Sequence, residues 1–308
     1  QLYWLKVYKI PEGSRTAKGK AVVNLIQLQP DEKIKAIIPT TDFDESKSLA
    51  FFTKNGIVKR TNLSEFKNIR SVGVRAISLD ENDELVTALI AQTYDDMPVT
   101  DPENELSVET EVLEVEELQN EIDEDSVNAE EDANSCDETM LFVVTKKGMC
   151  LKFKISKVRQ MGRTARGVTG IKFKEPGDEV VGAAVIESND QEILSISQKG
   201  IGKRTTADEY RLTNRGGKGV ICMKLTSRTG DLVGVVMVDE EQDLMALTSS
   251  GKMIRVDMQS IRKAGRNTSG VIVVNVDGDD VVSIARCPKA DDGEDEEEAP
   301  SEDMGLLE

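Results

Sequence analysis

Residues 142–153, FVVTKKGMCLKF, have the pattern of a β-hairpin. Strand-forming residues flank a short polar turn that ends in Gly148, where a tight turn needs a backbone with positive φ. Three further stretches superimpose on it, namely FFTKNGIVKRT (51–61), LSISQKGIGKRT (194–205) and MALTSSGKMIRV (245–256), with turn glycines Gly56, Gly200 and Gly251. The chain is therefore predicted to be a tandem repeat of hairpins.

A second glycine motif follows each hairpin. Its copies are RSVGVRAISL (70–79), RTARGVTGIKF (163–173), RGGKGVICMKL (215–225) and RNTSGVIVVNV (266–276). The gap between the two glycines is 19 residues in three copies (Gly148 to Gly167, Gly200 to Gly219, Gly251 to Gly270) and 17 in the copy from Gly56 to Gly73. Each copy continues with a strand, a polar turn and another apolar strand. Four short strands in about 50 residues predict an all-β, propeller-like ring of four-stranded blades.

Two irregularities modify this repeat. The stretch SRTAKGKAVVNLIQL (14–28) matches the second motif, and counting back 19 residues from Gly19 places its hairpin glycine at position 0. We therefore expect the chain to begin inside a hairpin, with residues 1–10 as an orphaned strand. Gly56 and Gly148 lie 92 residues apart instead of 51 or 52, which predicts an insertion between two blades at about residues 95–138.

The net charge of −18 is unevenly distributed. Residues 95–138 carry 19 acids and residues 290–308 carry 10, with no Lys or Arg in either, which leaves 28 acids against 39 bases elsewhere. We expect residues 290–308 to be a disordered tail, and the insertion to be disordered or to contain a short acidic amphipathic helix. The two segments act either as solvated spacers or as mimics of nucleic-acid charge, beside a basic body that suits a polyanion.

Several protein classes are excluded by composition. The chain has no histidine, which rules out Ser-His-Asp and Cys-His catalysis. Its four cysteines lack a C-x-x-C pair, which argues against a zinc site and a disulfide framework, so we expect reduced, mostly buried thiols. No apolar run approaches the length of a membrane span, and no leader is recognisable, so a cytosolic fragment is expected. The carboxylates Asp178 and Glu179 are the weakest candidates for acid–base catalysis, because they lie in a turn that recurs between blades.

Cations recur at fixed positions beside the glycines. In the second motif they lie mainly four residues and one residue before the glycine: Arg15, Lys18, Arg70, Arg163, Arg166, Arg215, Lys218 and Arg266. A second series follows the hairpin turns: Lys59, Arg60, Lys152, Lys203, Arg204 and Arg255. In a ring, equivalent positions lie at one height and form a belt for a polyanion.

The chemistry of the belt fits phosphate. Gly216, Gly217 and Gly219 would let main-chain N–H groups approach phosphate oxygens, and arginine supplies bidentate contacts that read no bases. For a single loop, a glycine-rich turn with solvated cations is the simpler interpretation, and RGGKG lacks the Walker pattern. Four copies in register favour the belt.

The stretches LKVYKIPEGSRTAKGKAVVNLIQL (5–28), NGIVKRT (55–61), MGRTARGVTGIKF (161–173) and GRNTSGV (265–271) closely resemble the C-terminal domain of DNA gyrase A. The resemblance covers about residues 1–289 apart from the insertion. It implies a six-bladed β-pinwheel whose blades exchange strands, with the first blade truncated here, and which wraps duplex DNA around a basic rim without sequence specificity. The family's Q-R-R-G-G-K-G box is degenerate in residues 213–219, where Thr213 and Asn214 replace Gln and Arg.

The resemblance also implies a larger assembly. The wrap would support ATP-dependent negative supercoiling by a cytoplasmic, chromosome-associated type II topoisomerase of two A and two B subunits, with ATP and Mg²⁺ used through other regions. None of the four tyrosines follows an arginine, so this part is expected to be catalytically silent, with no cofactor and no metal. Two alternatives remain open: the equivalent domain of the topoisomerase IV A subunit, and a propeller scaffold that binds proteins. The acidic tail favours gyrase.

Overall fold

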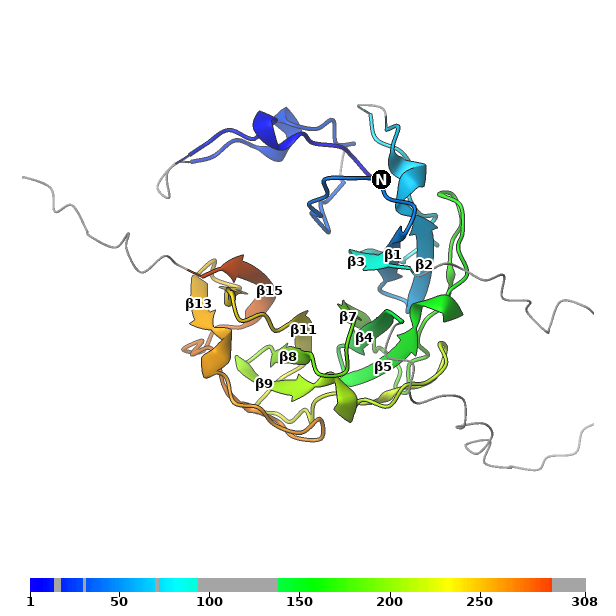
Figure 1. Cartoon of the computed structure of the whole chain (residues 1–308). Helices are drawn as coiled ribbons and strands as arrows, with labels where there is room; N and C mark the ends of the chain where they lie inside the picture. The colour runs from blue at the N-terminus through cyan, green and yellow to red at the C-terminus, as the bar shows by residue number, and fades with distance from the viewer. Residues whose placement is uncertain (14–17, 30–31, 70–71, 94–137, 290–308) are drawn as a thin grey trace, which may run out of the picture.

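The computed structural model describes residues 1–13, 18–29, 32–69, 72–93 and 138–289. Within these ranges the regular structure consists of β-strands and short 3-10 turns, without an α-helix. Four antiparallel sheets stand around a common axis (Figure 1). The predicted insertion and acidic tail fall almost wholly outside the described residues, as do Cys136 and the sequence considered for an amphipathic helix.

The sheets are named in chain order, and their strands are given from the axis outward. The first has β3 (Leu85–Gln92), β1 (Lys47–Thr53), β2 (Ile57–Asn62) and β6 (Val168–Thr169); the second has β7 (Val180–Ile186), β4 (Met140–Thr145), β5 (Met149–Lys154) and β10 (Val220–Ile221); the third has β11 (Leu232–Met237), β8 (Glu192–Ser197), β9 (Ile201–Thr206) and β14 (Val271–Ile272); the fourth has β15 (Val281–Pro288), β12 (Gln242–Thr248) and β13 (Met253–Asp257).

Each predicted hairpin is present. The pairs β1–β2, β4–β5, β8–β9 and β12–β13 turn at Gly56, Gly148, Gly200 and Gly251, all with positive φ. The outermost strand of each of the first three sheets comes from the following repeat: β6 joins β2, β10 joins β5 and β14 joins β9. The blades therefore exchange strands, and the second glycine motif lies at the outer circumference of the ring.

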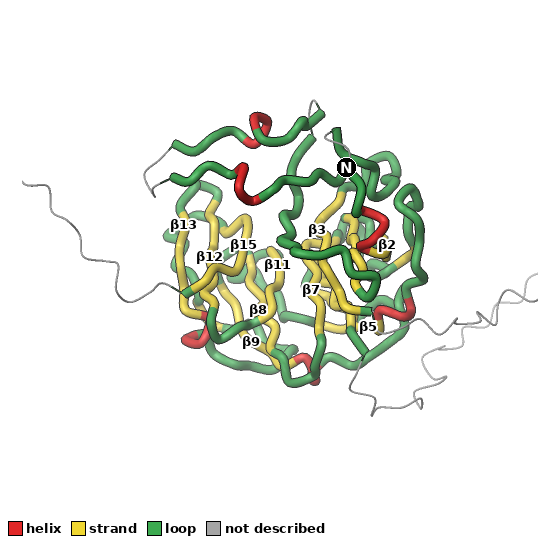
Figure 2. The backbone as a smooth tube through the Cα atoms, turned by 45° about the horizontal axis from the view of Figure 1, so that its top comes forward, coloured by secondary structure: helices red, strands yellow, loops and turns green. Residues whose placement is uncertain are grey.

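The described part of residues 1–42 contributes no named strand. Figure 2 shows it as loop with two 3-10 turns, η1 (Val7–Lys9) and η2 (Val22–Asn24). Leu2 forms a bridge with Val74, the residue after Gly73. This register matches the pairs Val58–Val168, Cys150–Val220 and Gly202–Val271, so Leu2 is the equivalent of Val58, as counting back from Gly19 predicts. The described residues form a propeller-like ring of four sheets, and the count of six blades stays a prediction.

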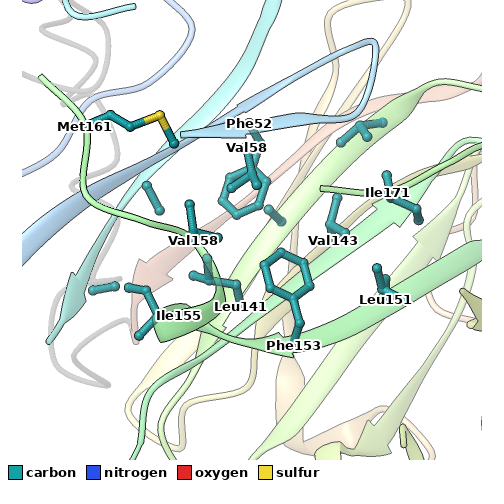
Figure 3. Packing of buried hydrophobic residues seen from close by; sticks show 14 residues of the cluster. Phe52, Val58, Leu141, Val143, Leu151, Phe153, Ile155, Val158, Met161 and Ile171 are labelled. Carbon is teal, nitrogen blue, oxygen red and sulfur yellow. The ribbon is translucent and has the colours of Figure 1, made fainter. Parts of the chain in front are cut away.

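The hydrophobic core is divided among the spaces between neighbouring sheets. Between the first and second sheets, Phe52 and Val58 pack against Leu141, Val143 and Phe153, all at most 2% exposed (Figure 3). Similar clusters fill the next two spaces, and a fourth joins the first sheet to residues of the N-terminal segment. Because each cluster draws on two repeats, one repeat alone has no closed core.

The ring has two sides, defined by the two ends of its strands. The hairpin-turn side carries the turns at residues 54–56, 146–148, 198–200 and 249–251. The 3-10 side carries the turns that follow the second hairpin strands, η3 (Leu63–Phe66), η4 (Ile155–Lys157), η5 (Ala207–Glu209) and η6 (Met258–Ser260). From each of η4, η5 and η6 the chain crosses the outer rim toward the hairpin-turn side. We call residues 159–167, 211–219 and 262–270 the rim loops.

Candidate nucleic-acid interface

The glycines that end the rim loops press against the preceding sheet. Gly167, Gly219 and Gly270 all have positive φ. A Cβ on Gly167 would lie 2.6 Å from the main-chain oxygen of Val58, and Cβ atoms on the other two would overlap the carbonyls of Cys150 and Gly202. The repeated glycine is therefore required because the outermost strand, which comes from the following repeat, packs closely against the sheet at this point.

The other two glycines of residues 215–219 form main-chain hydrogen bonds instead. The main-chain N–H of Gly216 donates to the oxygen of Gly170 at 2.6 Å, and the oxygen of Gly217 accepts from the N–H of Lys172 at 2.9 Å. Both bonds join this rim loop to the segment that follows β6 in the preceding repeat. The predicted phosphate contact through the N–H of Gly216 is therefore wrong, because a backbone acceptor already occupies that donor.

Arginines lie four residues before the glycines, as predicted. Arg215 is exposed, while Arg163 and Arg266 are half-buried. Arg215 Nε donates to the oxygen of Lys157 at 2.8 Å, and Arg266 Nη1 donates to that of Ile221 at 3.4 Å. Arg215 and Arg266 lie on the rim, but part of each guanidinium is hydrogen-bonded to the main chain of the neighbouring repeat.

The cations one residue before the glycines are more open. Lys18, Arg166 and Lys218 are all exposed. Arg166 forms an ion pair with Asp80, which offsets part of its charge locally. Arg15 and Arg70 lie outside the described residues, so their predicted place in the belt is untested.

Lys59 and Lys203 occupy a different position from the one predicted. Both are fully buried. Lys59 Nζ donates to the main-chain oxygens of Ala76 at 2.5 Å and Arg163 at 2.7 Å, and Lys203 Nζ donates to those of Gly265 and Arg266, both at 2.6 Å. An ammonium group removed from water needs such acceptors. Their assignment to an outward-facing belt is wrong. The outermost strand, β6 or β14, and the rim loop that precedes it cover these lysines.

Burial also changes the ionisation of the buried lysines. Desolvation lowers the pKa of Lys59 and of Lys203 to about 8, and lowers the pKa of Lys152 as well. The pKa falls because a charged ammonium group is costly to keep in a site without water. The carbonyl oxygens that accept its hydrogen bonds offset part of this cost. These lysines are held by the fold and do not face a ligand.

Arg60, Lys152 and Arg204 form a second series, at one register position on β2, β5 and β9; the first two are buried and Arg204 is half-buried. Each donates to a main-chain oxygen beside the 3-10 turn of the next repeat: Arg60 to Ile155 at 3.4 Å, Lys152 to Ala207 at 2.7 Å, and Arg204 to Ile261 at 2.7 Å. Trp4 is the equivalent residue of the first repeat, and its Nε1 donates to Phe66 at 2.9 Å. The series joins neighbouring blades, so its predicted place in the belt is wrong.

Arg255 holds the same register position on β13. Its Nε donates to Asp243 Oδ2 at 2.7 Å, and Nη2 donates to the oxygen of Pro288. The side chain is 38% exposed at the outer edge of the fourth sheet. It therefore reaches the surface while bonded within its own sheet.

One exposed series escaped the sequence prediction. Arg159, Arg211 and Arg262 lie eight residues before Gly167, Gly219 and Gly270, and all three are exposed. The constant spacing is visible in the sequence once the glycines are aligned. At that distance from the glycines, however, the three arginines resemble ordinary solvated cations of a loop.

The carboxylates Asp178 and Glu179 serve contacts on the hairpin-turn side. Asp178 Oδ1 accepts from the main-chain N–H of Lys147 at 2.9 Å. Glu179 pairs with Lys54 at 3.0 Å and Lys146 at 3.2 Å. Burial raises the pKa of Glu179, but the bonds from these two lysines outweigh it and lower the pKa overall.

The described residues offer neither a metal site nor a membrane-spanning helix. No cluster of three or more His, Cys, Asp or Glu in that part of the chain could hold a metal ion. No helix there is long and apolar enough to cross a membrane. Cys150, Cys222 and Cys287 are free thiols, of which the first two are buried.

Comparisons with known proteins match the repeat organisation. A protein-family model described as "DNA gyrase C-terminal domain, beta-propeller" matches residues 1–41, 47–92, 139–187, 191–239 and 242–288, which are the five repeats inferred from the glycines. The A subunit of DNA gyrase from Campylobacter fetus is 74% identical over 301 residues, covering 96% of this chain and 33% of the relative. The A subunit of DNA gyrase from Helicobacter pylori (strain 26695) is 48% identical over 305 residues, covering 99% of this chain and 31% of the relative.

Solved structures agree on the fold. A structure titled as that of the DNA gyrase A C-terminal domain has a TM-score of 0.66 at 22% identity, covering 88% of this chain and 75% of that one. The C-terminal domain of DNA topoisomerase IV has a TM-score of 0.68 at 23% identity, covering 92% and 74%. The chain spans about a third of the length of the curated relatives it matches. Because the family model matches five segments along the chain, and the relatives at 74% and 48% identity are both A subunits of DNA gyrase, this protein belongs to the DNA gyrase A C-terminal domain family.

Proposed function

We propose that this chain binds duplex DNA along the outer rim of the ring and wraps it without reading its sequence. The observation that supports the proposal is the repeated placement of exposed cations on successive rim loops: Arg166, Arg215 and Lys218 in two neighbouring repeats, with Lys18 in the first. Arginine and lysine contacts to phosphate fix a duplex in position but carry no base information. A wrap needs such contacts along its whole path, because bending 20–30 bp by 40–90° costs about 1–6 kcal/mol.

The larger role follows from the relatives, which carry the name of the DNA gyrase A subunit. In the intact protein the domain is a six-bladed β-pinwheel. The DNA that it wraps presents a segment for ATP-dependent strand passage, which introduces negative supercoils. That enzyme contains two A and two B subunits, acts on the chromosome in the cytoplasm, and uses ATP and Mg²⁺ through regions other than this one. This domain supplies DNA geometry and no catalytic residue.

The equivalent domain of topoisomerase IV is the nearest alternative. The fold does not separate the two, since the two solved domains have TM-scores of 0.66 and 0.68. The relatives at 74% and 71% identity are gyrase subunits, which favours the gyrase assignment. A scaffold that binds proteins would show little salt-dependent affinity for DNA.

A titration of the 308-residue chain with duplex DNA across a salt series tests the binding. Replacing Arg163, Arg166, Arg215 and Lys218 by Glu should weaken affinity and reduce the slope of log K against log salt, by about 0.9 for each phosphate that is no longer neutralised. As a matched comparison, Arg215→Glu with Lys218→Glu on the rim is set against Arg286→Glu with Lys289→Glu at the inner strand β15. Unchanged affinity in the rim variants, or equal loss in both pairs, would refute rim binding.

Wrapping requires a separate measurement. A relaxed, nicked plasmid is incubated with the chain, religated, and freed of protein, and its linking number is measured. A chiral wrap leaves a shift of one sign that grows with protein concentration. Binding without any shift would reject wrapping while leaving DNA binding intact.

A further inference from the structure

Arg159, Arg211 and Arg262 differ from Arg215 and Arg266 in how far their side chains are bonded within the protein. All three are exposed, and none of them makes an ion pair within the described part of the chain. By contrast, Arg215 and Arg266 donate to main-chain oxygens of the neighbouring repeat. A guanidinium that is already bonded within the protein has fewer donors left for a ligand. Arg159, Arg211 and Arg262 are thus better suited to phosphate than Arg215 and Arg266.

These arginines hold equivalent places on the 3-10 side of the rim. Each lies two residues after the end of η4, η5 or η6. The next residue, Gln160, Leu212 or Lys263, forms a parallel bridge with Arg60, Lys152 or Arg204 of the preceding sheet. The bridges fix the register, so the three side chains recur at one level from blade to blade.

A series of acids recurs on the hairpin-turn side, at the inner strands. Each polar turn there ends in an acid at the start of an inner strand, and these acids pair with lysines of other repeats: Glu84 with Lys35 at 3.0 Å, Glu179 with Lys54 at 3.0 Å, Asp231 with Lys147 at 3.1 Å and Asp280 with Lys199 at 2.5 Å. These ion pairs lie beside the hairpin turns, whereas no acid in the described part of the chain pairs with Arg159, Arg211 or Arg262.

We propose that Arg159, Arg211 and Arg262 form a second line of phosphate contacts, and that duplex DNA lies against the 3-10 side of the rim. The proposal rests on the proposed DNA binding and specifies its path. Each of them lies four positions before Arg163, Arg215 or Arg266, a span of at most about 14 Å. The grooves of B-DNA are about 6 Å and 12 Å wide, so one duplex can touch both lines with its two backbones.

The test compares two triple variants of the 308-residue chain in which the same amount of charge is removed. One replaces Arg159, Arg211 and Arg262 by Gln. Its matched control replaces Lys174, Arg228 and Lys252 by Gln, three exposed cations on the hairpin-turn side. Binding to a mixed-sequence duplex of about 150 bp, one persistence length, is titrated across salt. The arginine triple should lower the salt slope by about 2.7, or 0.9 for each phosphate released, and the control by less than a third of that.

Equal changes in the two triples, or no change in the arginine triple, would overturn the proposed path. If the arginine triple is poorly folded, the unmodified chain provides the second measurement. Modification of arginines by phenylglyoxal, located by mass spectrometry, should show Arg159, Arg211 and Arg262 protected by bound duplex, and lack of protection refutes the path. If replacing Arg163, Arg166, Arg215 and Lys218 also left the affinity unchanged, rim binding itself would be refuted, and not only this path.

Discussion

Lys59 Nζ lies 2.7 Å from the main-chain oxygen of Arg163, a rim residue of the following repeat. The same relationship recurs between Lys203 and the oxygen of Arg266, at 2.6 Å. At the equivalent position of the sheet between them stands Leu151, which cannot donate. Two of the three rim loops are thus fastened by a buried ammonium group, and the buried and exposed cations of the repeat are physically linked.

Replacing Lys59 or Lys203 by Met should loosen one rim loop locally. Each change leaves two main-chain oxygens without their donor, which costs about 1–3 kcal/mol of unfolding free energy. Amide exchange should accelerate around residue 163 or 266, and DNA affinity should fall although no exposed charge is removed. Leu151→Met is the matched control, expected to cost less than about 1.5 kcal/mol. Unaltered exchange in the lysine variants would contradict the fastening.

Stability should depend on pH through the same two lysines. Their pKa is about 8 in the folded chain and 10.5 ordinarily, so between these values the unfolded chain binds more protons. The free energy of unfolding should therefore rise with pH in this window, by up to about 1.4 kcal/mol per pH unit for each lysine. Urea unfolding at several pH values checks this, with Lys59→Met/Lys203→Met as the reference. Equal pH slopes for the two proteins would count against the shifted pKa values.

The repeat was readable from the sequence, but the placement of its cations was not. The hairpin glycines and the equivalence of Leu2 with Val58, which places it against Val74, follow from constant spacing, whereas the exchange of strands was expected only from the family resemblance. Lys59 and Arg60 could not be placed in this way, because lysine and arginine are rarely buried and their acceptors come from a loop about 100 residues away. Strand alternation tells which side chains share a face. It does not tell that a neighbouring repeat covers that face.

Gly219 and Gly217 should respond differently to alanine, although both belong to RGGKG. Gly219 has positive φ, and its added Cβ would overlap the carbonyl of Cys150. We expect a loss of about 1–2 kcal/mol from the backbone and about 1–3 kcal/mol from the overlap. For Gly217→Ala the nearest atom to the added Cβ is Leu151 Cδ1 at 3.5 Å, an ordinary contact, so stability should change by less than about 1 kcal/mol. Thermal unfolding measures both.

DNA titration of the same pair separates a packing role from a phosphate-binding role. If Gly217 serves only to shape the loop, Gly217→Ala binds duplex as tightly as the unmodified chain. Weaker binding by a fully stable Gly217→Ala would instead show that phosphate approaches the backbone at this glycine, as the sequence suggested.

The acidic segments should compete with DNA for the rim. Residues 95–137 and 290–308, which lie outside the described residues, hold 28 of the 57 acids and no base. Glu138 is left in place, because its carboxylate pairs with Lys154 at 3.3 Å. Replacing Asp by Asn and Glu by Gln throughout both segments should tighten duplex binding at low salt by about tenfold, or 1.4 kcal/mol.

Salt and length provide the controls for this competition. Because exposed charges more than a Debye length apart are screened, about 8 Å at physiological ionic strength, the gain should shrink as salt is raised. A variant lacking residues 290–308 should show part of the gain, in proportion to the 10 acids removed. If deletion tightens binding but neutralisation at full length does not, the segments act by occupying space, and electrostatic competition is wrong.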